Sequence, residues 1–186
     1  FRMKSRPVRR FLLAMIAWLG MLSCEKNRTL RSYSGELNFP DQPFNYAAQP
    51  LPDFYQNQFI RIQWNAPASN PITDWGATLG RVLFYDTRLS RNQSVSCASC
   101  HRQEFGFADP ARFSRGFQGG TTKRHSMSLL NAGYYLNGRY FWDERAATLE
   151  EQVLHPIQDP LEMGLSLDQL LLRIQSVSYY GDLYER

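Results

Sequence analysis

The stretch S-C-A-S-C-H-R-Q-E, residues 96–104, organises the rest of this 186-residue sequence. Cys97 and Cys100 are separated by two residues, and His101 follows at once. This is the spacing that attaches a c-type haem, because two thiols can form thioethers with the vinyl groups while the imidazole binds the iron as proximal ligand. The sequence therefore predicts one covalently bound haem c, held by these three residues.

Two other kinds of site use a similar spacing. A thioredoxin-like dithiol pair should follow a strand and open a helix in a βαβ pattern, and the sequence shows no such pattern. A zinc site needs four ligands, so the C-x-x-C-H motif would have to recruit His125 or His155 in an unusual order. Both alternatives are weaker than haem attachment.

Residues 1–23 have the features of a secretion signal. Five basic residues and no acidic residue occur there, and the apolar run from Phe11 to Leu22 is broken only by Gly20. A basic start, an apolar stretch and a small residue at Ser23 are typical of secretory signals. The run is too short to span a bilayer, which needs about 20 apolar residues. We expect this segment to direct export to the periplasm.

Cys24 stands where bacterial lipoprotein signals are cut and the new terminal cysteine is acylated. Lipidation there would tether the protein to a membrane from outside the cytoplasm. The alternative is an ordinary signal peptide followed by an incidental cysteine. With two cysteines assigned to haem and one to lipid, none of the three remains for a structural disulfide. Export also suits the haem, since c-type attachment is completed outside the bacterial cytoplasm.

The net charge depends on the signal segment. The formal charge of +4 falls to −1 when the five basic residues of the signal are removed. The charge of the remaining chain therefore gives no support for a nucleic-acid partner.

Residues 24–70 are predicted to form a linker or wrapping arm. Five prolines occur there, and neither a helical nor a strand periodicity persists for more than a few residues. Eight aromatic residues are too many for a purely flexible spacer. We expect part of this arm to pack against the following domain.

Residues 71–186 are predicted to form an all-α, cytochrome c-like haem domain with long loops. Thr73 is a plausible N-cap for a helix that ends near Tyr85, after which a loop delivers the haem motif. Capping boxes at residues 148–151 and 166–169 predict two further helices. The apolar face of the first helix consists of Trp75, Leu79, Val82 and Leu83.

The two ends of the sequence also suggest an expectation. The chain begins with Phe1, ahead of Met3, and stops at Arg186 directly after a predicted helix. We expect it to be a piece of a longer protein.

Seven sequence blocks carry a family resemblance. In order they are L-G-R-V-L-F-Y-D-T-R-L-S (79–90), S-V-S-C-A-S-C-H (94–101), F-G-F-A-D (105–109), S-L-L-N-A (128–132), F-W-D-E-R-A (141–146), L-E-E-Q (149–152) and P-L-E-M-G (160–164). Over about residues 71–164 they resemble the N-terminal haem domain of bacterial di-haem cytochrome c peroxidases and the related MauG proteins. The resemblance implies a peroxidatic haem at His101, fed with electrons by a second haem in a C-terminal domain that these residues do not include.

The resemblance also implies roles in the distal pocket and partners. Glu162 matches the distal glutamate that serves as acid and base in peroxide cleavage. Gln152 matches a glutamine that hydrogen-bonds in the same pocket, and Trp142 matches the tryptophan between the two haems. The implied partners are hydrogen peroxide and a small electron-donor cytochrome or copper protein. A homodimer is compatible with this interpretation.

Two positions depart from the pattern of the classical peroxidases. Many of them carry a histidine that caps the iron where this sequence has S-R-G-F-Q-G-G, with Phe117 at or near that place. Phenylalanine cannot bind iron, so we expect an open or water-bound sixth position and activity without reductive activation, as in the MauG branch. His125 stands where an asparagine near an interdomain calcium is often found, so calcium is left open.

Three functions follow from this interpretation. The leading one is a haem peroxidase, supported by Gln152 and Glu162. The second is an electron-transfer cytochrome, which would need a sixth ligand such as His125, His155 or Met127, although a loop or surface role is expected for each. The third is a MauG-like oxidase acting on a protein or organic substrate, which begins with the same O–O cleavage.

Overall fold

The computed structural model describes residues 37, 39 and 42–186. The predictions of export and of lipidation at Cys24 concern residues outside this description. The chain divides into two units, and all elements below belong to the second, Gln42–Arg186. In the described residues all regular structure is helical, with isolated bridges in place of strands. The prediction of an all-α fold is therefore confirmed.

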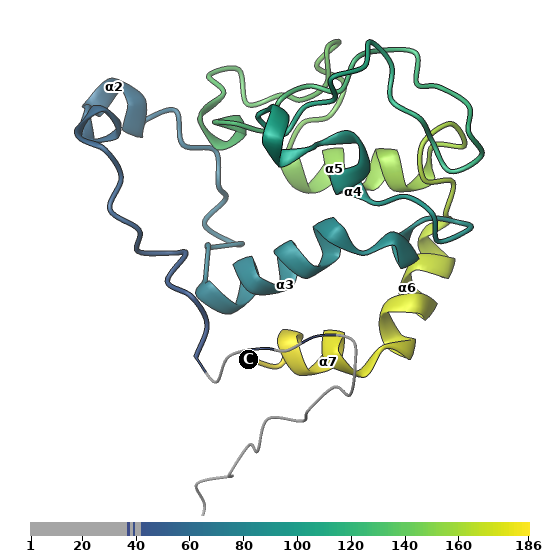
Figure 1. The fold of residues 1–186 in the computed structure, drawn as a ribbon. Helices are drawn as coiled ribbons and strands as arrows, with labels where there is room; N and C mark the ends of the chain where they lie inside the picture. The colour runs from purple at the N-terminus through teal and green to yellow at the C-terminus, as the bar shows by residue number, and fades with distance from the viewer. Residues whose placement is uncertain (1–36, 38, 40–41) are drawn as a thin grey trace, which may run out of the picture. The chain divides into compact units, whose positions relative to one another are not determined.

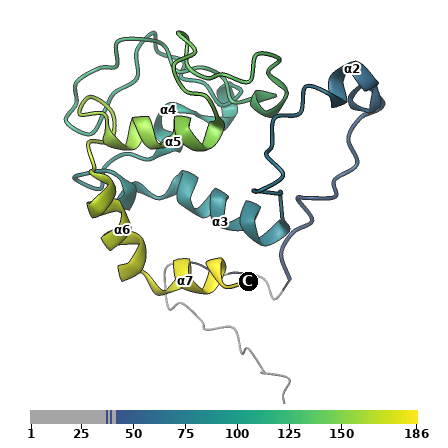
Figure 2. The same ribbon diagram turned by 180° about the vertical axis from the view of Figure 1, so that it is seen from behind.

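Helix α3, Asp74–Tyr85, lies between α4 and α7 (Figures 1 and 2). Thr73 caps it, since the Thr73 hydroxyl accepts a hydrogen bond from Gly76 N at 2.9 Å. The Arg186 guanidinium lies 4.5 Å from the centre of the Trp75 ring, which joins the end of the chain to the start of this helix. Both predicted ends of the first helix are confirmed.

Helices α5, Leu149–Gln158, and α6, Leu167–Ser176, begin at the two predicted N-caps, but the complete capping box forms only at α6, because the Glu151 carboxylate accepts from Ala147 N instead of Thr148 N. The Thr148 hydroxyl accepts from Glu151 N at 3.1 Å, and the Ser166 hydroxyl accepts from Gln169 N at 3.3 Å. A further helix, α7, spans Ser178–Tyr184. None of the described helices is long and apolar enough to cross a membrane.

The main hydrophobic core lies where the loop after α3, the C-terminal part of α5 and helix α6 meet. Its buried members come from two distant stretches of the sequence, at residue 89 and at residues 157–165, so the core forms only when the chain has folded back on itself. They are Leu89, Ile157, Met163 and Leu165, with Leu83, Val95, Leu170 and Ile174 packed against them.

The remaining elements are single turns. They are η1 (Asp53–Gln56), α2 (Gln58–Arg61), η2 (Thr87–Leu89), α4 (Cys97–Cys100), η3 (Gln103–Phe105) and η4 (Ala132–Tyr134). The long connections between them confirm the expectation of helices joined by extended loops.

Residues 42–70 of the arm pack against the following domain, as expected, and Asn70 Nδ2 also donates to Glu150 Oε1 of α5 at 3.0 Å. Asn65 N donates to Gly133 O at 2.8 Å, and the Trp64 ring lies 4.8 Å from that of Tyr134. The Asp74 carboxylate accepts hydrogen bonds from Tyr46 N and Ala47 N, both at 2.7 Å. These contacts tie the arm to η4 and to the start of α3.

Candidate haem site

Helix α4 is a single turn that carries both cysteines of the motif. Ser96 starts it, because its backbone N donates to the Ser99 hydroxyl at 2.9 Å while Ser99 N donates to Ser96 O at 3.0 Å. His101 N closes the turn on Cys97 O at 2.9 Å. Cys97 and Cys100 are half-buried free thiols. One helical turn thus presents two thiols and the adjacent imidazole together.

The His101 ring is oriented by the loop that follows it. Its Nδ1 lies 3.0 Å from Phe107 O, so Nδ1–H donates to this carbonyl and Nε2 is left with the lone pair that binds a metal. The loop is closed by Arg102 N to Ala108 O at 3.1 Å and Phe107 N to Arg102 O at 2.9 Å. Gly106 and Phe107 both have a left-handed backbone, with φ of 66° and 59°. This strained turn aims the carbonyl at His101.

Burial shifts the pKa of each residue of the motif. It raises the pKa of both thiols, Cys97 and Cys100, and lowers the pKa of His101. A lowered imidazole pKa favours the neutral form, which is the form that binds a metal. The half-buried thiols remain protonated to higher pH than an exposed cysteine.

The chemistry of these groups fits a c-type haem. Cys97 and Cys100 would hold it through thioethers, and Nε2 of His101 would bind its iron. Zinc fits less well, because no three His, Cys, Asp or Glu side chains gather as ligands in the described residues. The described part also has no βαβ unit of the kind that a thioredoxin-like dithiol requires.

Glu162 lines an open pocket of about 360 Å³. Burial raises the pKa of its carboxyl group, the negative charge of Asp159 raises it further, and Arg145 opposes both effects. The charge of Glu162 also contributes to the raised pKa of Cys97 and of Cys100, so the carboxyl group lies near the haem motif. The pocket is lined by Arg145, His155, Pro156, Gln158, Asp159 and Glu162.

A tight turn after α5 holds Glu162. Glu162 N donates to Asp159 O at 3.0 Å, and Gly164 N donates to the same carbonyl at 2.9 Å. Phe117 N donates to Glu162 O at 2.9 Å from the other side. The approach is close, because a Cβ on Gly116 would lie 1.7 Å from Leu161 O. Glu162 is therefore fixed by main-chain contacts on both sides.

Phe117 is part of this packing and is only 7% exposed. Its ring covers Gly164, where a Cβ would lie 2.3 Å from Phe117 Cε1. Asn92 Nδ2 donates to Phe117 O at 2.7 Å. The residue expected to stand in place of an iron-binding histidine thus supports the turn of Glu162. The open sixth position remains a prediction.

The structure does not bring the other two predicted site residues into the pocket lining. Gln152 is half-buried on α5, and Trp142 is 59% exposed. Trp142 Nε1 donates to His125 O at 2.9 Å. His125, Met127 and His155 are all exposed, which matches the surface role expected for them. His155, on α5, also lines the pocket beside Glu162.

Arg145 and Asp159 are pocket residues that the sequence reasoning did not assign. Arg145 belongs to the block F-W-D-E-R-A, but its direction depends on left-handed backbone at Phe141 and Glu144, with φ of 70° and 54°. Its guanidinium stacks 3.5 Å above the Phe141 ring, and that ring meets the edge of His155 at 5.4 Å. The repeated left-handed residues gave no recognisable signal in the sequence.

Comparison with known proteins identifies the family. The profile of the family described as "Di-haem cytochrome c peroxidase" matches residues 75–186. The chain belongs to this di-haem cytochrome c peroxidase family. The match contains the whole haem motif and the Glu162 turn, so the family's haem c accounts for the fit of the C-x-x-C-H residues described above.

Individual relatives of this peroxidase family agree. The methylamine utilization protein MauG of Methylorubrum extorquens is 38% identical over 118 residues, which are 63% of this chain and 33% of MauG. The cytochrome c551 peroxidase of Pseudomonas aeruginosa is 36% identical over 118 residues, 62% of this chain and 33% of that enzyme. The chain therefore spans about a third of the length of these relatives.

Solved structures of the family have the same fold. A MauG-like protein associated with microbial copper homeostasis superposes with a TM-score of 0.57 and 37% identity, over 63% of this chain and 35% of that one. The diheme peroxidase BthA from Burkholderia thailandensis superposes with a TM-score of 0.55 and 31% sequence identity, over 63% of this chain and 34% of BthA. The fold of the site is thus that of a di-haem peroxidase domain.

Proposed function

We propose that this chain is the peroxidatic part of an oxidoreductase that reduces hydrogen peroxide to water. The observation that carries the proposal is Glu162, a partly buried carboxyl group with a raised pKa that lines a pocket close to the haem motif. A raised pKa brings the acid and base forms closer in population near neutral pH. This suits a group that has to accept a proton and give it back.

A haem held by Cys97, Cys100 and His101 would supply the iron and the electron transfer that O–O cleavage requires. Glu162 takes a proton from one peroxide oxygen and returns it to the other, which then leaves as water. Two electrons and two further protons complete the conversion of one peroxide into two waters. The family resemblance implies that Gln152 hydrogen-bonds on the distal side of the haem and that Trp142 lies toward the second haem, although neither residue lines the pocket beside Glu162.

The electrons come from a small cytochrome or copper protein through a second haem domain outside these 186 residues. This part of the proposal is supported by the family and by the length of the relatives, of which the chain covers about a third. Export to the periplasm, with a lipid tether at Cys24, is supported by the pattern of residues 1–24. The same residues that attach haem c are compatible with that location.

A second candidate is oxidation of a protein or organic substrate. It is favoured by the 38% identity to MauG and by Phe117, which by the family resemblance lies at or near the place of an iron-capping histidine. Both candidates share the proton transfer by Glu162. They differ in the electron donor, which is a small redox protein in the first candidate and the oxidised substrate in the second. Supplying a small reduced cytochrome and following its oxidation measures the difference.

The test compares the haem-loaded parent with Glu162→Gln and with Glu150→Gln. Glu150 is an exposed carboxylate on α5 and keeps its hydrogen-bonding oxygen as glutamine. We expect Glu162→Gln to slow the reaction with peroxide by a factor of about 100 or more, as for loss of an acid–base group. Glu150→Gln should react like the parent. Stopped-flow absorbance of the haem measures the rate.

Two results would contradict the proposal. One is a Glu162→Gln variant that reacts at the parent rate. The other is a low-spin haem that is indifferent to peroxide in the parent itself, which would mean that a residue fills the sixth position. The chain would then be an electron-transfer cytochrome.

A further inference from the structure

The loop of residues 86–95 leads from α3 to the haem motif and is closed by one buried serine. Ser90 is completely buried. Its hydroxyl donates to Thr87 O at 2.9 Å and accepts from Val95 N at 3.2 Å. Val95 directly precedes Ser96, which starts α4. The position of the haem motif therefore depends on the shape of loop 86–95.

The same loop also contacts the turn that carries Glu162. Arg91 N donates to Met163 O at 2.8 Å. Asn92 Nδ2 donates to Phe117 O, and Phe117 N in turn donates to Glu162 O. Loop 86–95 is thus joined to His101 through the chain and to Glu162 through hydrogen bonds. It is the part of the molecule that both halves of the site share.

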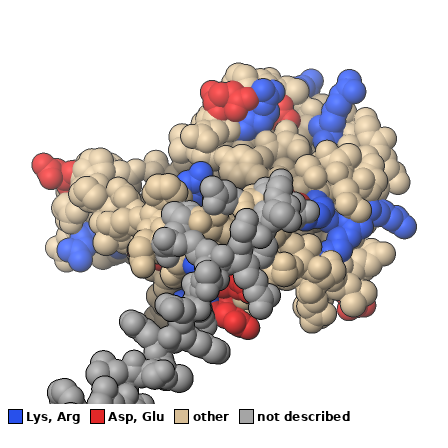
Figure 3. Space-filling view, turned by 60° about the horizontal axis from the view of Figure 1, so that its bottom comes forward, with Lys and Arg blue, Asp and Glu red and all other residues tan. Residues whose placement is uncertain are grey.

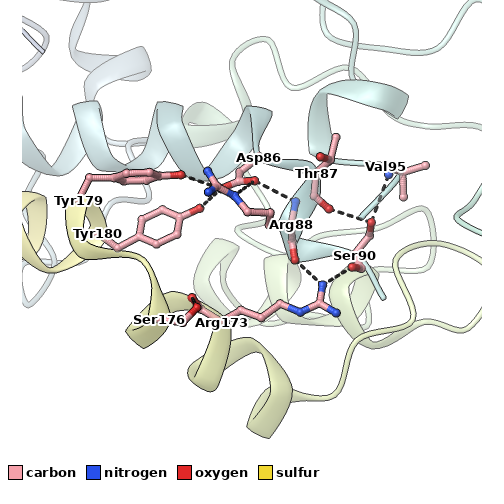
Figure 4. Close-up of polar contacts among 9 residues, drawn as sticks. All are labelled: Asp86, Thr87, Arg88, Ser90, Val95, Arg173, Ser176, Tyr179 and Tyr180. Atoms are coloured by element: carbon pink, nitrogen blue, oxygen red, sulfur yellow. Dashed lines mark hydrogen bonds and ion pairs between the residues drawn. The ribbon is translucent and has the colours of Figure 1, made fainter. Parts of the chain in front are cut away.

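Arg173 of α6 grips this loop from the side (Figure 4). Its Nη1 donates to Arg88 O and Ser90 O, and its Nη2 donates to Arg91 O at 2.9 Å. A planar guanidinium can donate hydrogen bonds to three carbonyls at once, because its N–H groups have fixed directions. The ammonium of a lysine, on a flexible side chain, does this less well. Each of these carbonyls would lose a donor if Arg173 were shortened.

Helix α7 fixes the beginning of the loop. The Asp86 side chain is 7% exposed and pairs with Arg88 Nε at 2.9 Å. It also accepts hydrogen bonds from the hydroxyls of Tyr179, at 3.2 Å, and Tyr180 (Figure 4). Both tyrosines are almost fully buried, at 1% and 2% exposure. The backbone N of Arg88 donates to the Asp86 carboxylate as well, at 2.9 Å, and a buried carboxylate with four donors is held in one place.

We propose that Arg173 is a positioning residue. Through its hydrogen bonds to three carbonyls of loop 86–95, its guanidinium fixes the position of His101 relative to Glu162. The catalytic half of this inference rests on the proposed peroxidase function. Arg173 touches no site residue, and it acts through the carbonyls of Arg88, Ser90 and Arg91. Helices α6 and α7 thereby help to hold the haem motif and the Glu162 turn in position.

The experiment uses the haem-loaded protein with Arg173→Gln, Arg173→Lys and Arg112→Gln. Arg112 is an exposed loop arginine whose guanidinium stacks on the Phe113 ring, so it controls for loss of one arginine. Hydrogen exchange measures the exchange rates of the amides of residues 86–96. Resonance Raman spectroscopy measures the frequency of the iron–histidine stretch of His101. Stopped-flow absorbance reads the reaction with peroxide.

For Arg173→Gln we expect exchange in residues 86–96 to become at least about tenfold faster, because three carbonyls lose their donor. The iron–histidine frequency should shift, and the peroxide rate should fall about 10- to 100-fold, as small misplacements of reacting groups do. Arg173→Lys should lie between this variant and the parent, and it provides the measurement if the glutamine variant does not fold. Arg112→Gln should match the parent.

The proposal is overturned if a folded Arg173 variant keeps the parent's Raman frequency and peroxide rate. It is overturned equally if exchange accelerates throughout the domain with no change at the haem, since Arg173 would then only add stability. Failure of the proposed function looks different: Glu162→Gln would leave the peroxide reaction unchanged, while the Arg173 variants still altered loop exchange and the His101 frequency.

Discussion

The geometry of the site depends on a few residues with unusual backbone. Phe107, with φ of 59°, turns its carbonyl toward His101 Nδ1. Gly164, with φ of 64°, lets the Phe117 ring lie against the main chain beside Glu162. The motif C-x-x-C-H could be recognised from spacing alone, because its chemistry is local. The left-handed backbone angles could not be recognised from the sequence, because the contacts that require them form only when distant segments of the chain meet.

The glycine at 164 can be tested against a matched glycine. Gly164→Ala places a methyl group 2.3 Å from the Phe117 ring in a left-handed backbone. We expect it to lower the free energy of unfolding by about 2–5 kcal/mol, from backbone strain and forced repacking. Gly119 also has a left-handed backbone, but a Cβ there meets nothing within 4 Å. Gly119→Ala should cost only about 1–2 kcal/mol.

Urea unfolding of both variants measures the difference. Equal losses of unfolding free energy would show that the contact between Gly164 and Phe117 does not constrain the turn. Backbone strain would then account for the loss at both positions.

Among the elements, the sequence predicted helix starts better than helix positions in space. Thr73, Thr148 and Ser166 were recognised as caps, because N-capping is a short-range hydrogen bond between near neighbours. Helix α7 was not predicted as a separate element. Its buried Tyr179 and Tyr180 face a carboxylate more than ninety residues away, which no local pattern reveals.

The cap of α5 allows a prediction about that helix. Thr148→Ala removes the hydroxyl that accepts from Glu151 N. We expect a loss of about 1 kcal/mol in the free energy of unfolding, which is typical of an N-cap. Thr121→Ala, at an exposed loop position, should change it by less than about 0.5 kcal/mol. Chemical unfolding followed by circular dichroism compares them, and equal effects would exclude a role for the cap.

At the scale of the whole molecule, the chain matches about a third of the length of its relatives. The net charge of the chain without its signal segment gave no support for a nucleic-acid partner, and on the face in Figure 3 the basic side chains lie in several separate groups. The sequence blocks predicted Glu162 as a site residue, and the structure places it in the lining of a pocket that also contains Arg145 and Asp159, which the sequence did not single out. Asp159 adjoins Glu162 in the turn after α5, whereas Arg145 reaches the pocket only through tertiary folding.

Stability of the whole domain should depend on pH through Glu162. Its pKa is raised by burial, so the folded state favours the protonated form. The stabilisation from this group is complete below the ordinary glutamate pKa and is lost as the pH rises through the raised value. Glu162→Gln should therefore be more stable relative to the parent at pH 7 than at pH 4.

Thermal unfolding at both pH values, with matched preparations, measures this difference. Glu104→Gln supplies a control of opposite sign, because its own backbone N–H and Arg102 lower the pKa of exposed Glu104. That variant should lose stability relative to the parent as the pH rises from 4 to 7. A relative stability of Glu162→Gln that is the same at both pH values would show that its carboxyl group is not desolvated.

The contacts of Arg173 and Tyr180 with residues 86–91 join parts of the chain that are synthesised at different times. Helices α6 and α7 both follow Cys97, Cys100 and His101 in the sequence. A chain cut before α6 would therefore keep all three haem-binding residues but lack the contacts that hold the loop in front of them.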